Sequence, residues 1–281
     1  MKIAIFDEDR LGLVTDEGRG IVDVSHALPS HDPGFGAGFW VRMCNEFDGL
    51  RPRLEAARDG GEVLPIETVD LRAPVLNPTK VVAAAANYAD HVEEMRPRGL
   101  AEWMLDFDVF LKAPSSITGP GSTVRLPSIE AEIHYEGELA LVIGKRGRHI
   151  SPEHALDHVL GWTILLDITE RGSGDRSRRK SYDGFTPIGP WVTTADEIPD
   201  WRDLRIELRL NGEVRQEVKA GEMLVSVPEI IAHASTIMTL FPGDVITTGA
   251  PPGVGRIEPG DDVEVEITGL AGMAIHVDRE V

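Results

Sequence analysis

The clearest local signal in the chain is a β-hairpin. Apolar and polar residues alternate from Leu204 to Leu210 and lead directly into Asn211-Gly212, a dipeptide that favours a tight two-residue turn, with Val214 on the return strand. Glycine and proline, 29 and 19 of the 281 residues, interrupt the rest of the chain often enough to require many further turns. The sequence therefore predicts a fold built mainly from short strands.

The net charge restricts the class of partner. The chain has 28 Lys and Arg residues against 47 Asp and Glu residues, a formal net charge of −19. A surface this acidic disfavours nucleic acid and anionic membranes, because both are negatively charged. No stretch approaches the ~18–20 consecutive apolar residues of a membrane-spanning helix. We expect a partner that is a small molecule or a cation, with no nucleic acid and no membrane.

Cysteine content and the first residues bear on location. Cys44 is the only cysteine, so an intrachain disulfide is excluded, and no Cys/His cluster has the spacing of a zinc site. Residues 1–8 lack the basic start and apolar stretch of a signal peptide. We therefore expect a cytoplasmic protein.

Two structural units are expected. Three short apolar pieces predict a small antiparallel meander, over 2–6, 11–15 and 20–24. A helical pattern follows over 34–61, interrupted at Pro52. The proline-containing segment 64–77 is typical of a linker, so we place a boundary near residue 72. A small N-terminal domain then covers 1–72, and a larger domain covers 73–281.

Capping residues indicate three helices in the larger unit, beyond an apolar strand over 80–86. The helices are expected from Asn87 to Met95, from Ser151-Pro152 to Gly161, and from Ser226 to about Leu240, the last with Glu229 completing a capping box.

Three carboxylates follow a pattern that suits a metal ion. Glu136 and Glu138 are two apart in a strand-like run, which places both on one face of a strand. A second apolar strand, 162–166, ends in Asp167. Such a set suits a hard divalent ion such as Mg²⁺ or Mn²⁺, which prefers oxygen ligands and keeps positions open for a substrate. The alternative is a solvated face for the glutamates and a turn cap for the aspartate.

Two further clusters carry chemistry. In a helix, His91 and Glu94 share one face, so the carboxylate can orient an imidazole that takes a proton from water. The alternative is a surface histidine with an acidic neighbour. The segment from Arg171 to Lys180 is rich in arginine within an acidic chain, which favours binding of an anionic substrate. Its alternative is a solvated loop that balances nearby acidic groups.

Together these clusters resemble the fumarylacetoacetate hydrolase family, over approximately residues 76–278. Eight stretches carry the resemblance in order: Asn87-Tyr88 with His91 and Glu94, then FLKAP at 110–114, YEGELALVIGK at 135–145, DITER at 167–171, KSYDGFTPIGP at 180–190, NGE at 211–213, PGDVITTG at 242–249 and PGD at 259–261. One such stretch arises by chance, whereas eight in this order are specific for a fold.

The resemblance implies a catalytic domain of the α+β class that is mainly β, a mixed β-sandwich or β-roll of the fumarylacetoacetate hydrolase type, usually found as a homodimer. It implies Mg²⁺ or Mn²⁺, with Ca²⁺ as a substitute, held by the carboxylates that match Glu136, Glu138 and Asp167. Family members act on small anionic 2-oxo or 1,3-dicarbonyl acids. They hydrolyse acylpyruvates, decarboxylate oxaloacetate, or isomerise, hydrate or dehydrate related oxo acids.

The resemblance also implies roles for single residues. The family's catalytic His-Glu pair, carried on a mobile lid, matches His91 and Glu94, and a substrate-contacting lysine matches Lys180. The expected substrate-binding residues are Arg171, Lys112, Tyr88 and Thr248.

Hydrolysis of a β-diketo acid is the leading expectation. Water activated by His91, itself oriented by Glu94, would attack the distal carbonyl of a metal-chelated acylpyruvate, and pyruvate enolate would leave with help from Lys180. A lyase or an isomerase at the same site is the alternative, because decarboxylation needs the same electron sink without activated water. A non-catalytic metal-binding dimer is a further alternative.

The third-ligand region departs from the family pattern. Glu170, Gly172 and Gly174 stand where relatives often have Ala, Asp and Gln, and the loop to Lys180 is shorter and richer in arginine. These changes leave the expected metal ligands intact and alter the expected substrate side. We therefore hypothesise that the loop accommodates a dicarboxylate or a bulkier anionic substrate.

Overall fold

The N-terminal meander continues into a large central sheet in the computed structural model, which describes residues 1–28, 37–98, 106–128 and 130–280. Its strands β1 (Lys2–Phe6), β2 (Arg10–Val14) and β3 (Gly20–Asp23) pair antiparallel in succession, as the three apolar pieces predict. β1 also pairs with β13 (Thr186–Thr194). One sheet thus runs through both expected units, and the boundary near residue 72 stays a prediction.

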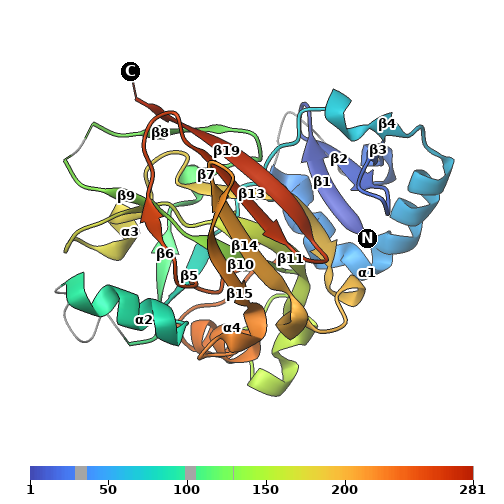
Figure 1. Ribbon diagram of the computed structural model, residues 1–281. Coiled ribbons are helices and arrows are strands. Elements are labelled where there is room, and N and C mark those ends of the chain that lie inside the picture. The colour runs from blue at the N-terminus through green and yellow to red at the C-terminus, as the bar shows by residue number, and fades with distance from the viewer. Residues whose placement is uncertain (29–36, 99–105, 129, 281) are drawn as a thin grey trace.

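The described strands form three sheets (Figure 1). The largest has the order β4-β3-β2-β1-β13-β11-β10-β16-β5-β6, with β7 beside β13. Its remaining strands are β4 (Leu64–Pro65), β5 (Val81–Ala85), β6 (Asp108–Lys112), β7 (Ile117–Thr118), β10 (Gly137–Ile143), β11 (Val159–Leu166) and β16 (Val245–Thr247). A small sheet comprises β9 (Ile133–Tyr135), β12 (Thr169–Glu170) and β17 (Gly255–Arg256). The third comprises β8 (Thr123–Leu126), β14 (Arg205–Leu210), β15 (Glu213–Lys219), β18 (Asp262–Ile267) and β19 (Ala271–Arg279).

The main core lies between the central and the third sheet. β18 alternates exposed and buried residues, and its buried face joins one apolar cluster with residues of β10, β11 and β14. β10 is buried along its whole length, because it has sheet partners on both edges and packed layers on both faces. The expectation of a mainly β chain of the α+β class is confirmed, and the hairpin predicted at Asn211-Gly212 joins β14 to β15.

The long helix α1 (Ala37–Gly60) corrects one expectation. We expected Pro52 to interrupt the helical pattern, but the helix continues through it. Pro52 lies on the exposed side, where water can satisfy the carbonyl that loses its hydrogen bond, while Leu50 and Leu54 remain buried. The glycine-rich start of the pattern falls partly outside the described residues.

Two helix boundaries also differ from the predictions. α2 (Ala89–Met95) has Tyr88 at its N-cap position, without a side-chain capping bond. The side chain of Asn87 instead bonds the backbone of Val225 and Thr248. The helical segment that follows Ser151 is a 3₁₀ helix that ends at His158 (Pro152–His158). Gly161 lies inside β11, where a Cβ atom would meet the carbonyl oxygen of Thr193 at 2.3 Å. This glycine therefore marks a close approach between strands.

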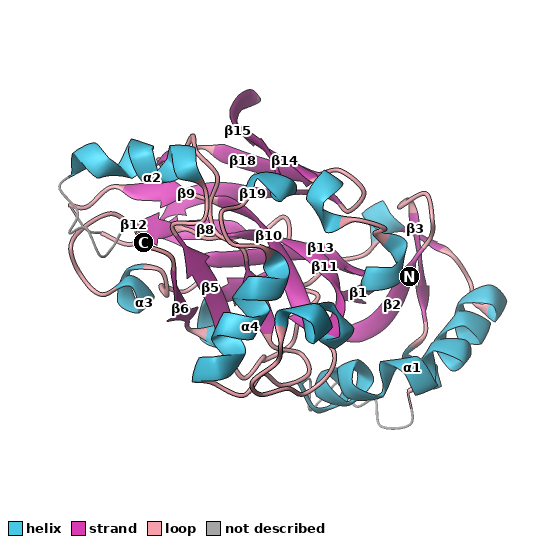
Figure 2. Ribbon diagram, turned by 90° about the horizontal axis from the view of Figure 1, so that it is seen from below, coloured by secondary structure: helices cyan, strands magenta, loops and turns pink. Residues whose placement is uncertain are grey.

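The remaining helices are short. α4 (Val227–Ile237) has the predicted Ser226–Glu229 capping box and ends three residues before the expected Leu240. α3 (Arg176–Arg179) is a single turn within the arginine-rich segment. Figures 1 and 2 show α2 and α3 at one end of the molecule and α1 with the N-terminal strands at the other. No helix within the described ranges combines the length and apolar character that crossing a bilayer requires.

Candidate active site

Three carboxylates meet where strand β10 begins and strand β11 ends. Glu138 belongs to β10, Glu136 precedes it, and Asp167 directly follows β11. The antiparallel register sets Asp167 opposite Glu136, and the Asp167 N–H donates to the Glu136 carbonyl over 2.8 Å. One carboxylate oxygen from each residue lies within 4.8 Å of the others, and all three side chains are buried. The solvated-face alternative is therefore wrong.

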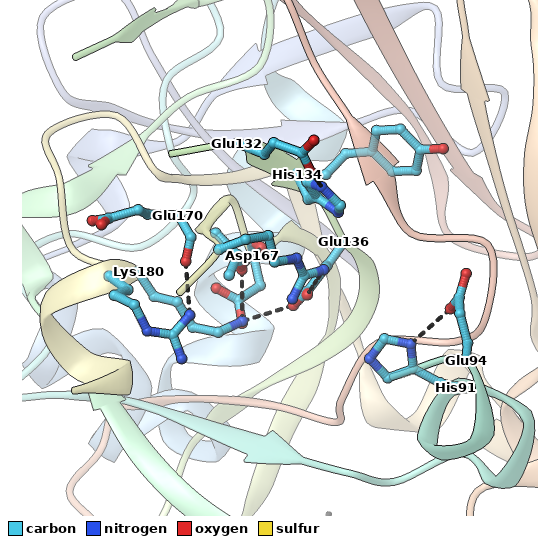
Figure 3. A network of polar contacts seen from close by, with 12 residues as sticks. His91, Glu94, Glu132, His134, Glu136, Asp167, Glu170 and Lys180 are labelled. Atoms are coloured by element: carbon cyan, nitrogen blue, oxygen red, sulfur yellow. Dashed lines mark hydrogen bonds and ion pairs between the residues drawn. The ribbon is translucent and has the colours of Figure 1, made fainter. Parts of the chain in front are cut away.

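Lys180 connects two of these carboxylates, as Figure 3 shows. Its Nζ donates to Glu136 Oε2 over 2.7 Å, to Asp167 Oδ2 over 2.5 Å and to Thr169 Oγ1 over 2.7 Å. Arg171 adds a bond of 2.7 Å from Nη2 to Glu136 Oε1. The predicted Arg171 and Lys180 thus lie directly beside the predicted carboxylates.

Glu138 is held by a different element. Its Oε2 accepts hydrogen bonds from Thr247 Oγ1 and, over 2.7 Å, from the Gly249 N–H. Thr247 is the last residue of β16, which pairs with β10, and Gly249 follows two residues later. The turn that follows β16 thus brings the backbone amide of Gly249 to a carboxylate.

The charges at this site are poorly balanced around Glu138. Burial and the neighbouring carboxylates of Asp167 and Glu136 raise its pKa to about 8. Burial also acts to raise the pKa of Glu136, but Lys180 and Arg171 outweigh it and hold that pKa below its ordinary value. A bound cation would relieve the repulsion at Glu138. Three buried carboxylates from rigid strands are the oxygen donor set that Mg²⁺ and Mn²⁺ prefer, so the site fits either ion.

A histidine and a glutamate from α2 form a pair near these carboxylates. His91 is buried, and its Nδ1 lies 3.1 Å from Glu94 Oε2 (Figure 3). When Nδ1 carries the proton it donates to Glu94, which leaves Nε2 as the proton acceptor. Glu94 is itself fixed by the Gly253 N–H over 3.3 Å. The alternative of a surface histidine is therefore wrong.

A cavity of about 490 Å³ brings these groups together. Two of the carboxylates, Glu136 and Glu138, line it together with His91 and Lys180. The arginine-rich segment closes one side with Arg171, Arg176 and Arg179, and the apolar side is formed by Ala84, Met95 and Phe110 among others. Acid-base groups, carboxylate ligands and cationic side chains therefore converge on one volume large enough for a small anionic molecule.

Three residues expected to bind substrate lie elsewhere. Of the described residues that line the cavity, none is Tyr88, Lys112 or Thr248. Tyr88 packs in the main core, where burial raises the pKa of its phenol. Lys112 Nζ donates to Asp167 Oδ1, and Thr248 Oγ1 donates to the Leu139 carbonyl. Lys112 and Thr248 therefore hold Asp167 and the β10 backbone in place without lining the cavity. This geometry does not favour direct contact of either residue with substrate.

Sequence reasoning missed several groups that build the site. Thr247 and the Gly249 amide reach Glu138 only through the pairing of β16 with β10, which local patterns do not reveal. Thr169, an acceptor for Lys180, has the two-residue spacing from Asp167 that gave Glu136 and Glu138 their interest. That spacing could have identified Thr169 as a residue of the site.

Comparisons with known proteins agree with this geometry. Residues 80–278 match the family model described as "Fumarylacetoacetate (FAA) hydrolase C-terminal". The chain is 38% identical over 291 residues to the maleylpyruvate hydrolase of Aquipseudomonas alcaligenes, covering 99% of both chains. It is 34% identical over 278 residues to a mitochondrial oxaloacetate tautomerase of Xenopus laevis, covering 94% of this chain and 85% of the relative.

A solved structure extends the similarity to three dimensions. The crystal structure of maleylpyruvate hydrolase from Sphingobium sp. SYK-6, in complex with manganese(II) and pyruvate, superposes with a TM-score of 0.90 at 37% identity and full coverage of both chains. The expected fold of the fumarylacetoacetate hydrolase type is thereby confirmed. With a matching family model, close full-length relatives and the same fold, this chain belongs to the fumarylacetoacetate hydrolase family.

Proposed function

We propose that this protein is a divalent-metal-dependent hydrolase that cleaves a carbon–carbon bond in an acylpyruvate-type β-diketo acid. One observation carries the proposal: a cluster of possible metal ligands and an oriented base meet at a single cavity. The cluster is Glu136, Glu138 and Asp167, and the base is His91, which is paired with Glu94. A purely structural cation site has no use for an oriented base beside it. Two relatives named maleylpyruvate hydrolase make maleylpyruvate the first substrate to test.

The first part of the proposed mechanism is activation of the substrate by a bound metal ion. We infer that Glu136, Glu138 and Asp167 hold Mg²⁺ or Mn²⁺, with Ca²⁺ as a substitute. When bound, the ion supplies a Lewis acid for the carboxylate and 2-oxo oxygens of the substrate, which lowers the energy of negative charge developing on the pyruvyl half. The crystal structure of the Sphingobium relative, with manganese and pyruvate, supports this assignment.

The second part of the proposed mechanism is activation of water and stabilisation of the enolate by the protein's side chains. His91 Nε2 takes a proton from water while Nδ1 stays hydrogen-bonded to Glu94, and the resulting hydroxide attacks the distal carbonyl. The carbon–carbon bond then breaks, which gives a carboxylic acid and the enolate of pyruvate. Burial acts to lower the pKa of Lys180, but Asp167 and Glu136 outweigh it and raise that pKa, so its ammonium group stays charged beside the enolate. Arg171 contributes a second positive charge on the same side.

An isomerase at the same site is the second candidate. It is favoured by the identity of 34% to an oxaloacetate tautomerase, which needs proton transfer without attack by water. Lyase activity, such as decarboxylation of oxaloacetate, shares the same electron sink.

A product assay separates these functions. Metal-loaded enzyme is incubated with maleylpyruvate, acetylpyruvate and oxaloacetate, and pyruvate, CO₂ and the keto–enol ratio are followed for wild type and His91→Gln. Pyruvate release from acylpyruvates that falls about 100-fold or more in His91→Gln supports the hydrolase. If neither acylpyruvate is cleaved, tautomerisation would replace the hydrolase with the isomerase, and CO₂ release would replace it with the lyase.

Oligomeric state and location are also proposals. We infer a homodimer, supported by the family resemblance, and a cytoplasmic location, supported by the sequence composition. Light scattering coupled to size-exclusion chromatography distinguishes a dimer from a monomer of 30.7 kDa.

A further inference from the structure

The loop between Arg171 and Lys180 brings additional positive charge to the cavity. Arg176, the first residue of α3, lines the cavity and is half-buried. The charged groups near it include Asp108 and Glu136. Burial is the largest influence on the pKa of Arg176 and lowers it. A guanidinium in such a place is only partly solvated, so a carboxylate that reaches it gains more than it would at an exposed arginine.

The other arginines of α3 hold the loop in place. Arg178 Nη2 donates to Glu170 Oε1 over 2.9 Å, and Arg179 donates to the carbonyls of Gly174 and Glu170 over 2.8 and 2.7 Å. Tyr182 adds a bond of 2.7 Å to Glu170 Oε2. Glu170, which departs from the family pattern, is thus the anchor of the loop that presents Arg176.

The Asp175 side chain completes this arrangement by capping α3. Its Oδ1 accepts the Arg178 N–H over 3.0 Å. The position of Arg176 is therefore set by bonds on both sides of it in the sequence, a preorganised placement that keeps the entropy lost on binding small.

The charge of the described cavity lining favours a dianion. Among the described residues, four cationic side chains line the cavity together with three carboxylates: Arg171, Arg176, Arg179 and Lys180 against Glu132, Glu136 and Glu138. Asp167 lies behind them and is paired with Lys112, so these two charges cancel. The described lining is therefore positive by one charge, and a divalent ion adds two more. A substrate with two carboxylates compensates for more of this excess than a substrate with one.

The size of the cavity agrees with a second acidic group. At roughly 30 Å³ of liquid volume per water molecule, a cavity of about 490 Å³ has room for far more than a three-carbon oxo acid. The cavity is bounded on one side by the loop and helix α3 that carry Arg176.

From this geometry we propose that Arg176 binds a second carboxylate at the far end of the acyl group, so that the enzyme selects dicarboxylic acylpyruvates over acylpyruvates with an uncharged end. The inference rests on the proposed hydrolase function. It adds the residue that recognises the acyl group of the substrate. Arg176 donates to the distal carboxylate, and the loop anchored by Glu170 holds it there.

The test compares kcat/KM for maleylpyruvate and acetylpyruvate in wild type, Arg176→Gln and Arg176→Lys. The ratio of the two values falls about 10- to 100-fold in Arg176→Gln, mainly through KM for maleylpyruvate, because a charge-assisted bond is lost. Arg176→Lys keeps the charge without the planar fork and recovers part of the ratio. Arg202→Gln, an exposed arginine paired with Asp200 away from the cavity, controls for the lost charge and leaves the ratio unaltered.

A binding measurement decides the inference without turnover. Calorimetry of metal-loaded enzyme compares maleate with crotonate, which has the same carbon number and only one carboxylate. Tighter binding of maleate that disappears in Arg176→Gln supports the inference. Equal ratios and equal maleate affinities in wild type and Arg176→Gln overturn it, even when both substrates are cleaved. Cleavage of neither acylpyruvate by wild type counts against the hydrolase function instead, and the maleate titration still decides the role of Arg176.

Discussion

Lys112 Nζ donates a hydrogen bond of 2.6 Å to Asp167 Oδ1, and both side chains are buried. A second bond of 3.0 Å reaches the Phe185 carbonyl. Burial lowers the pKa of Lys112, while the charge of Asp167 acts to raise it. The lysine on β6 therefore orients a carboxylate at the end of β11, and its contribution to the site passes through Asp167.

Lys112→Met removes one of the two lysine partners of the buried Asp167 carboxylate and leaves Lys180 as the other. We expect the free energy of unfolding of the metal-free protein to fall by about 3–5 kcal/mol, because Asp167 loses a buried ion pair. Mn²⁺ is expected to restore part of this loss. Urea unfolding with and without Mn²⁺ measures both effects, and Lys145→Met, at an exposed lysine, serves as the matched control. A loss below about 1 kcal/mol would show that Lys112 does not support Asp167.

Glu138→Gln keeps the shape of the side chain and removes its charge. We expect Mn²⁺ affinity to fall by about 100-fold or more, because a carboxylate ligand is replaced by a weaker amide donor. The metal-free variant should unfold at the same or a higher temperature, since repulsion with Glu136 and Asp167 is relieved. Titration calorimetry measures the affinity, with Glu132→Gln as the control from the same cavity lining. Unchanged Mn²⁺ binding in Glu138→Gln would remove this residue from the ligand set.

Gly249→Ala tests the backbone contact to Glu138. Gly249 has φ +98°, and a Cβ atom there would lie 2.8 Å from the Asn87 Cβ. We expect a loss of about 2–4 kcal/mol in unfolding free energy together with weaker Mn²⁺ binding, because the Gly249 N–H must move away from Glu138. Gly184, with φ +78° and open space around its Cβ, provides the control: Gly184→Ala should cost about 1–2 kcal/mol and leave Mn²⁺ binding intact. Equal effects of the two substitutions would speak against the contact.

Glu94→Gln separates orientation of the base from the base itself. The amide can still accept from His91 Nδ1 but no longer stabilises a charged imidazole, so we expect kcat to fall by about 10- to 1,000-fold with little change in KM. His91→Gln should lower kcat further. Steady-state kinetics on acylpyruvates together with Mn²⁺ titration checks that only the acid-base step is affected. If Glu94→Gln raised KM and left kcat intact, Glu94 would act in substrate binding.

Much of the fold could be predicted because its signals are local. The Asn211-Gly212 turn, the Ser226–Glu229 capping box and the apolar run that ends in Asp167 each depend on neighbouring residues, and the structure confirms all three. Asn87 and Gly161 carried equally familiar local signals, but long-range contacts decided their roles. Asn87 bonds two distant loops, and Gly161 lets another strand approach.

The residues of the candidate site were likewise predictable only where their signals are local. Glu136 and Glu138 share a strand, and Asp167 marks a strand end, so their chemistry could be predicted from spacing. Lys112, in contrast, was expected in the substrate pocket and instead supports a carboxylate 55 positions away. Contacts of this kind depend on sheet order, which no local pattern of one sequence encodes.

Pyruvate release from maleylpyruvate, before and after removal of metal, tests the central claim most directly. Wild type should lose activity in EDTA and recover it with Mn²⁺, whereas Glu138→Gln should stay inactive at the same Mn²⁺ concentration. Undiminished pyruvate release in EDTA, or full activity of Glu138→Gln, would contradict a reaction that depends on a divalent ion held by these carboxylates.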